Sequence, residues 1–420
     1  MRNPCICLLV FVSLFICTAL NAQAPDASVP VNNFAKLFPN PTGQNGYEEL
    51  VRAGDILANS QAWNDYEKSQ GEDKIPTLAM KRRVVADTQV RMALETLRTG
   101  LKKPVRSPRT TLDDETILPE LARFRSLARL IGVEIYVQLA DGRVPLALDT
   151  LAEALKFGYV AQTDTLISSL VSVAIDAIVI RSIADHLDQL SVRDCEKLTA
   201  LVKDWLALPD PAIPILQLDK KGAATILNKY KSDPIKLMKM LEPGNTSPDQ
   251  KERHAQLEQA VAANPNAASG LFDQAGQIVA GQYDQAIAGL SQPVWQRAPL
   301  KPADKSTQAG LLADLLAGEG MLNSVMDRYA REQAQVQMLG VHAAIRRYLW
   351  EYSSLPGGLQ ELKLGSLIID PFNGRPFDYK TLEGTKYSLS SVGPIDRNPG
   401  PGAPAGQRIP IEIPPKPRPQ

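Results

Sequence analysis

Residues 352–396 read YSSLPGGLQELKLGSLIIDPFNGRPFDYKTLEGTKYSLSSVGPID and carry the most specific structural pattern in the chain. They predict the end of a long amphipathic helix, a turn and two short strands. Pro356 and the two glycines after it end the helix, because proline removes a backbone donor and glycine has little helical preference. The segment therefore predicts a small α+β unit that begins at a helix end.

The turn and the strands of this unit follow from local rules. In residues 370–374, DPFNG, the aspartate can bond nearby backbone, the proline fixes φ, and Asn-Gly favours a corner with positive φ. Apolar and polar residues then alternate around Tyr379 and again around Leu389, with a turn near Glu383-Gly384 between them. We expect an antiparallel hairpin packed on the preceding helix.

The order of these motifs is similar to that in type II secretion pseudopilins, the short pilin-like subunits of a bacterial secretion machine. The resemblance covers residues 329–396, with a helix, LP, LxEL, DPFxGxPFxY and YxLxSVGPxD in sequence. The residues that define the motif here are Pro356, Asp370, Pro371, Gly374, Pro376, Tyr379 and Gly393. The resemblance implies a helix with a small hairpin, and no catalytic residue belongs to it.

This chain departs from the pseudopilin pattern at two points. Pseudopilins begin with a hydrophobic helix that anchors and assembles them, and none directly precedes this unit. Residues 393–398, GPIDRN, hold one acid, whereas calcium takes roughly six to eight oxygen ligands. We expect a borrowed fold without a metal, and the whole chain resembles secreted bacterial proteins that join such a unit to a helical domain.

Composition limits the class of protein. The length of 420 residues exceeds one comfortable core, so two domains are expected. Forty-six Lys and Arg residues balance 46 Asp and Glu residues, which argues against a nucleic-acid partner. The predicted division is a signal peptide (1–24), a linker (25–46), a helical domain (47–297), a linker (298–307), a long helix with the α+β module (308–396) and a proline-rich tail (397–420). The predicted fold class is mainly α: an irregular helical-hairpin domain followed by a small α+β module.

The N-terminus reads as an export signal. Arg2 precedes an apolar run at residues 6–20 that is shorter than the roughly 20 residues of a membrane span, and small residues follow at 22–24. Cleavage after Ala22 or Ala24 gives an exported mature chain without a transmembrane span; an uncleaved anchor is the alternative. Of the cysteines, Cys195 alone lies beyond this leader, so the mature chain has no intramolecular disulfide, and a packing role is expected for it.

Helical periodicity dominates the region between the leader and the α+β module. Residues 119–156 predict a helical hairpin that turns at Asp141-Gly142. Residues 142–155, GRVPLALDTLAEAL, resemble the second helix of a tetratricopeptide repeat, but no period of 34 residues is sustained. Residues 311–350 predict one long helix, loosened at Gly318 and Gly320. The tail at 397–420 favours an extended polyproline conformation; it is expected to be untethered, although an aromatic groove or a sheet edge could hold it.

An acid interrupts the most apolar segment beyond the leader. Residues 166–180, LISSLVSVAIDAIVI, predict the central buried helix of the first domain, with Asp176 inside it. An unpaired buried carboxylate is expensive, so Asp176 needs a partner. We expect Arg181 or an arginine in residues 124–129 to form an ion pair with it.

The chain shows none of the short motifs that carry known chemistry. His186, His254 and His342 lie in separate helical segments without metal-ligand spacing, and no nucleophile elbow or phosphate loop is present. No cofactor is therefore expected. The favoured hypothesis is a non-enzymatic envelope protein that binds a protein partner. The alternative is a periplasmic hydrolase or small-ligand carrier, with a cleft in which Asp176 or Glu134 faces His186.

Overall fold

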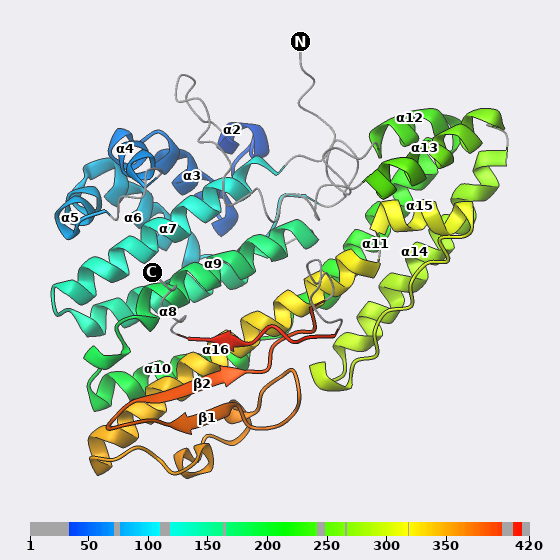
Figure 1. Cartoon of the computed structure of the whole chain (residues 1–420). Helices are drawn as coiled ribbons and strands as arrows, with labels where there is room; N and C mark the ends of the chain where they lie inside the picture. Colours follow the sequence, from blue (N-terminus) through cyan, green and yellow to red (C-terminus); the bar gives the residue numbers. More distant parts are fainter. Residues whose placement is uncertain are drawn as a thin grey trace.

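The protein is mainly α-helical, with one small antiparallel sheet, as Figure 1 shows for a computed structural model of the chain. The structure describes residues 33–70, 76–109, 118–162, 165–241, 248–264, 267–317, 319–396 and 406–413. The expected fold class is confirmed. The signal peptide and the cysteines within it lie outside the described residues.

Two sets of helices make up most of the fold. The first comprises α2 (Asn33–Leu37), α3 (Gly46–Ala58), α4 (Gln61–Ser69), α5 (Leu78–Ala86), α6 (Thr88–Leu101), α7 (Pro119–Ala140), α8 (Val144–Ala161), α9 (Leu166–Ala184) and α10 (Val192–Leu206). The second comprises α11 (Ala212–Lys229), α12 (Pro234–Met240), α13 (Pro248–Ala263), α14 (Ala268–Leu290), α15 (Gln308–Ala317) and α16 (Glu319–Tyr352). Short 3₁₀ turns occur at Leu187–Gln189, Tyr230–Ser232, Val294–Gln296, Leu359–Leu362 and Gly365–Ile368.

Local sequence signals set the ends of these helices. Ser191 and Asp194 form a reciprocal capping box at the start of α10, and Thr165 and Ser168 form another at the start of α9. The α7–α8 hairpin turns where the sequence predicts, with Gly142 at φ +72°. The loosening expected at Gly318 lies outside the described residues, since α15 is described to Ala317 and α16 from Glu319.

Buried apolar side chains form two clusters. The first hydrophobic cluster contains residues of α3–α10, of α16 from Ala330 onward, and of the chain after α16. The second hydrophobic cluster contains Leu166, residues of α11–α15 and the first part of α16. The expected linker at residues 298–307 contributes Leu300 and Ala303 to this second cluster. The predicted division into domains remains a prediction, and the apolar packing joins residues from both ends of the chain.

Helices α9 and α16 connect the two clusters, since each contributes residues to both. In Figure 1, α9 lies between α8 and the upper helices of the first set, and α16 crosses the molecule diagonally. By length and composition α9 could cross a membrane, with a mean hydropathy of 2.0 and half of its span buried in the protein. Core helices of soluble proteins have the same properties. Its packing against α7, α8 and α16 matches the buried helix that the sequence predicts.

The C-terminal module, residues 353–413, contains the sheet. Strands β1 (Asp378–Thr381) and β2 (Tyr387–Ser391) form the predicted hairpin, in which Tyr379 pairs with Leu389. A third strand, β3 (Ile411–Glu412), pairs with the other edge of β2 (Figure 1). The expectation of an untethered tail is therefore wrong for residues 406–413, because Ile411 and Ile413 gain burial against the sheet edge and α16.

The linker expected at residues 25–46 also differs in its described part. Residues 33–37 form α2, and the backbone N–H of Phe34 donates to Asp55 at 2.8 Å. Glu48 accepts hydrogen bonds from the backbone of Thr42 and Gly43 at 3.1 and 2.8 Å. The turn residues that suggested a loose linker are held instead by carboxylates of α3.

Candidate functional site

A pair of buried carboxyl groups lies where α9 crosses α16. Asp176 of α9 is fully buried, and Glu332 of α16 is buried as well. Apart from their contact with each other, neither oxygen of Asp176 nor Oε1 of Glu332 has a hydrogen-bond partner among the described residues. We name these two residues the acid pair.

The environment raises the pKa of both carboxyl groups of the acid pair. Burial raises the pKa of Asp176 far above its ordinary value, and the neighbouring Glu332 raises it further. Burial also raises the pKa of Glu332 to about 7, with a hydrogen bond from Asp176 lowering it and the charge of Asp210 raising it. Asp176 therefore holds a proton that it donates to the Glu332 carboxylate at neutral pH.

The expected arginine partner of Asp176 is wrong. Arg181 is exposed, and among the described residues no lysine or arginine forms an ion pair with Asp176. Arg129, one of the arginines considered, bonds instead to Glu67 at 2.9 Å. A shared proton satisfies the buried carboxyl without the desolvation of a guanidinium group.

The space around the acid pair is filled by backbone. A Cβ atom added to Gly158 of α8 would lie 2.0 Å from Oδ1 of Asp176, so the carboxyl packs directly on this glycine. The hydroxyl of Ser172 donates to the carbonyl of Gly158 at 2.6 Å and ties α9 to α8. This packing suits a structural role, because a substrate would need the space that Gly158 leaves to Asp176.

The cleft considered for an enzyme does not form from its expected residues. Glu134 faces Arg98, at 2.8 Å, and Arg98 also bonds to Glu153 at 2.7 Å. Burial raises the pKa of Glu134, and the charge of Arg98 opposes this. His186 stacks edge-on with Tyr136, with 5.4 Å between ring centroids, and contacts Gln189 through Nδ1 at 3.0 Å. Asp176, Glu134 and His186 are thus held in separate contacts.

Two further side chains that could take part in a reaction, Cys195 and His254, are also buried. Burial raises the pKa of the Cys195 thiol to about 12, so it stays protonated and packs in the first hydrophobic cluster, as expected. His254 contacts the carbonyl of Met238 through Nε2 at 2.8 Å. Cys195 therefore packs between helices, and His254 joins α13 to α12.

His342 is the residue that sequence reasoning missed. It is buried on α16, with Nδ1 2.8 Å from the hydroxyl of Tyr387 on β2. Burial lowers its pKa to about 4, and a hydrogen-bonding contact with the backbone of Ile413 offsets part of this. The ring therefore stays neutral and joins the helix to β2 and to the residue that follows β3. No local pattern in the sequence indicated that this histidine would meet Tyr387.

The predicted motif residues build the C-terminal module. Asp370 is fully buried and accepts hydrogen bonds from the backbone of Phe372 and Val392 and from the Ser391 hydroxyl, at 2.9, 2.8 and 2.9 Å. Pro371 is buried beside it, and Pro376 pairs with Ile369 in an isolated bridge. Asp370 thus fastens the turn to the end of β2.

The other motif residues connect this turn to its surroundings. Gly374 has φ +68°, and a Cβ atom there would lie 2.7 Å from the ring of Trp295, which precedes α15. The Tyr379 hydroxyl donates to the carbonyl of Pro356 at 3.0 Å and holds β1 to the end of α16. Gly393 has φ +66° and allows residue 409 to approach. The motif is therefore structural throughout.

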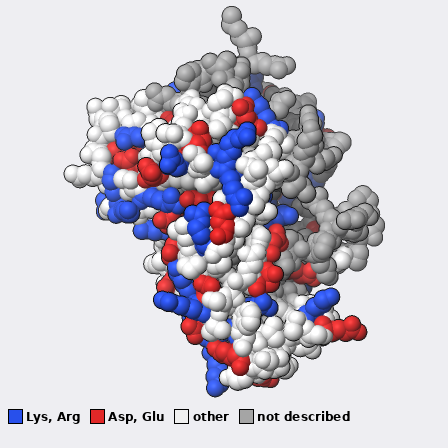
Figure 2. Space-filling model, turned by 90° about the vertical axis from the view of Figure 1, so that its left-hand side faces the viewer, with Lys and Arg blue, Asp and Glu red and all other residues white. Residues whose placement is uncertain are grey.

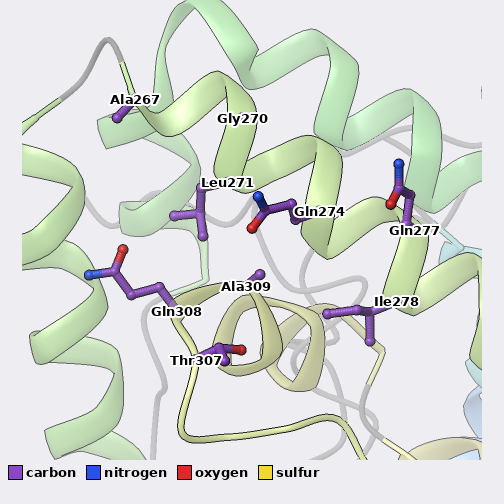
Figure 3. A pocket seen from close by; sticks show the side chains of 9 residues that line it. All are labelled: Ala267, Gly270, Leu271, Gln274, Gln277, Ile278, Thr307, Gln308 and Ala309. Atoms are coloured by element: carbon purple, nitrogen blue, oxygen red, sulfur yellow. The ribbon is translucent and has the colours of Figure 1, made fainter.

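A groove of about 820 Å³ lies between α14 and the start of α15 (Figure 3). Its lining consists of Ala267, Gly270, Leu271, Gln274, Gln277, Ile278, Thr307, Gln308 and Ala309. No acid, base or thiol is among these residues. The groove can offer hydrogen bonds and apolar contacts, but no group with a pKa suited to proton transfer.

The C-terminal module and the end of α16 expose several large apolar side chains. Trp350 is 54% exposed, Tyr352 62% and Leu382 55%. Ile395 and Ile409 are also exposed, so five of the eleven exposed large apolar residues among the described parts of the chain lie between 350 and 409. On the face that Figure 2 shows, basic and acidic groups are interspersed rather than separated.

No family model, curated protein or solved structure matches this chain. The pseudopilin and tetratricopeptide resemblances therefore remain proposals.

Proposed function

We propose that the chain is an exported protein of the cell envelope that acts as a scaffold and binds a protein partner through its C-terminal module, without catalysis. One observation carries this proposal: exposed aromatic and aliphatic side chains concentrate at the end of α16 and in the module. Aromatic residues are enriched in interface cores, and exposed apolar groups that lie together mark interaction sites. The leader supports export.

The state of the ionisable groups supports a non-catalytic role. The acid pair is packed against Gly158, Glu134 is paired with Arg98, and the thiol of Cys195 is protonated and buried. Enzyme sites gather such groups in concave, accessible positions. Each of these groups therefore has a structural contact.

The groove beside α14 favours a second candidate, a carrier of a small polar ligand. Gln274 and Gln308 are exposed at its two sides and could donate and accept hydrogen bonds (Figure 3). A variant with Gln274→Ala and Gln308→Ala should then lose binding of a small molecule that occupies this groove and raises the melting temperature of the protein. A thermal-shift series on both chains decides this candidate.

Site-specific crosslinking in cells tests the proposed function. A photoreactive amino acid at Tyr352 or Leu382 should give a discrete crosslinked product with another protein. The matched control is Leu146, which is 44% exposed on α8, outside the C-terminal module, and should give none. Equal products from all three positions, or turnover of a defined substrate by the purified protein without any crosslink, would contradict the proposal.

A further inference from the structure

Residues 406–413, GQRIPIEI, return along the C-terminal module as an extended segment. Their backbone exchanges hydrogen bonds with residues 394–396 at 2.6 and 2.9 Å, and β3 then pairs with the end of β2. We name residues 406–413 the tail segment. It completes a sheet edge that β2 would otherwise present.

The seat of the tail segment has apolar and polar parts. Ile411 and Ile413 are both buried in the first hydrophobic cluster, while Glu412 between them is only half-buried. Helix α16 contacts β3, and the ring of His342 interacts with the backbone of Ile413. An extended chain is thus held by backbone bonds along β2 and by two side chains that are two positions apart.

Gly393 shapes the entrance of this seat. A Cβ atom there would lie 1.8 Å from the carbonyl oxygen of Ile409, and its φ of +66° favours glycine. The guanidinium of Arg408 donates to the Gly393 carbonyl at 2.7 Å. Only glycine lets two extended chains approach each other at this point.

We propose that the groove between β2 and α16 is a strand-binding site, in which an extended segment of a partner protein replaces the tail segment. The partner segment would carry two β-branched aliphatic residues two positions apart, as Ile411 and Ile413 are. Strand addition to a sheet edge gives affinity through backbone bonds and specificity through alternate side chains. This inference rests on the proposed function and gives its partner a chemistry.

The tail segment is suited to exchange. Its ladder with β2 consists of two residue pairs, and its contacts described above lie within the C-terminal module and α16. A ladder this short opens with a smaller free energy than core elements. The groove can therefore open while the remaining helices stay folded.

Peptide binding to the full chain tests the proposal. The probe is a fluorescent peptide with the sequence of residues 406–413, and the variant Ile411→Asp with Ile413→Asp prevents the tail from burying its own side chains. Fluorescence anisotropy should show saturable binding to this variant, and binding at least about tenfold weaker to the unaltered chain, because a tethered segment competes at high effective concentration. The matched control, Leu146→Asp at an exposed residue of α8, should behave like the unaltered chain.

Three results would overturn the proposal. The first is absence of saturable binding to a double variant whose near-ultraviolet circular dichroism shows an intact fold. The second is equal binding of a control peptide with aspartate at both isoleucine positions. The third is self-association of the unaltered chain that the double variant loses, because a second copy would then be the occupant.

A second chain keeps the test decisive if the double variant does not fold. A specific protease site placed within residues 397–405 allows the tail segment to be cut after folding. The cut segment should exchange with excess labelled peptide, and its permanent retention would overturn the proposal. Peptide binding is measured on purified protein, so it can succeed when crosslinking at Tyr352 fails, and the reverse; the two failures are distinguishable.

Discussion

Burial shifts the pKa values of two polar sites on α16 in opposite directions. In the acid pair, Asp176 keeps its proton and the pKa of Glu332 is raised to about 7. His342 is neutral because it has lost its proton, with its pKa lowered to about 4. Burial disfavours the charged form in both cases. The same physical cause therefore makes the contact at Glu332 sensitive to base and the contact at His342 sensitive to acid.

The acid pair and His342 mark the two places where α16 connects neighbouring parts of the fold. At Glu332 it meets α9, where both helices pass from one hydrophobic cluster to the other. At His342 it meets β2 and the tail segment. Each junction contains a polar group that packs well only in its neutral form. The stability of each junction should therefore follow pH separately.

The largest expected effect concerns the acid pair. The raised pKa of Glu332 means that the folded chain binds more protons than the unfolded chain between about pH 4.5 and 7. Its stabilising effect is complete below the lower value and is lost as the pH rises through the upper one, at a cost on the order of 3 kcal/mol. Glu332→Gln should reduce this dependence by the part that belongs to Glu332, while Asp176 keeps the part caused by its own burial. Urea unfolding across that pH range measures it, and equal slopes for both chains would contradict it.

The opposite dependence should appear at His342. Its lowered pKa gives a stabilising effect that is complete above about pH 6.5 and is lost as the pH falls through about 4, again on the order of 3 kcal/mol. We rank this second because a single group titrates. His342→Phe should abolish the loss in acid while leaving the dependence from Glu332 unchanged. Amide hydrogen exchange in β2, compared at about pH 6.5 and at about pH 4, provides the measurement.

A glycine comparison sharpens the packing argument. Gly158→Ala places a methyl group against Asp176 and should destabilise the fold by about 2 kcal/mol. Gly132→Ala on α7 is the matched control, because its Cβ would lie 3.7 Å from Ile178 and Ser182. That change should stabilise the fold by roughly 0.5–1 kcal/mol through helix propensity. Chemical denaturation of both variants is sufficient, and a similar loss in both would refute the close packing.

The smallest effect separates two tyrosines of the sheet. Tyr387→Phe removes the hydroxyl that contacts His342 and should cost about 1 kcal/mol. Tyr379→Phe removes the bond to Pro356, where the hydroxyl is less deeply buried than that of Tyr387, and should cost less. Thermal unfolding of the two variants under identical conditions compares them. A larger loss for Tyr379→Phe would reverse the assignment of His342 as the stronger junction.

Local sequence rules accounted for much of the fold. Turn chemistry at residues 370–374 and the alternation around Tyr379 predicted the hairpin, and Asp141-Gly142 predicted the turn between α7 and α8. These features depend on neighbours in the sequence, so a single sequence contains them.

The missing parts depend on residues far apart. The partner of Asp176 is another acid on α16, and no local pattern indicates that two carboxyl groups will share a proton. The docking of residues 406–413 depends on the edge of β2, and proline-rich flanks concealed the pattern of Ile411 and Ile413. His342 and Tyr387 meet only through the packing of the sheet on α16. Tertiary contacts of this kind are not encoded in local periodicity.

The first hydrophobic cluster also constrains how the chain can be made. It combines helices from the first half of the sequence with α16 from Ala330 onward and with the C-terminal module. Domains generally fold during synthesis as soon as their residues have emerged. Here the early helices bury part of their apolar surface only against residues that follow Ala330, so a polypeptide interrupted before that point would leave this surface exposed to chaperones and proteases. The first hydrophobic cluster is therefore complete only when the C-terminal module has been synthesised.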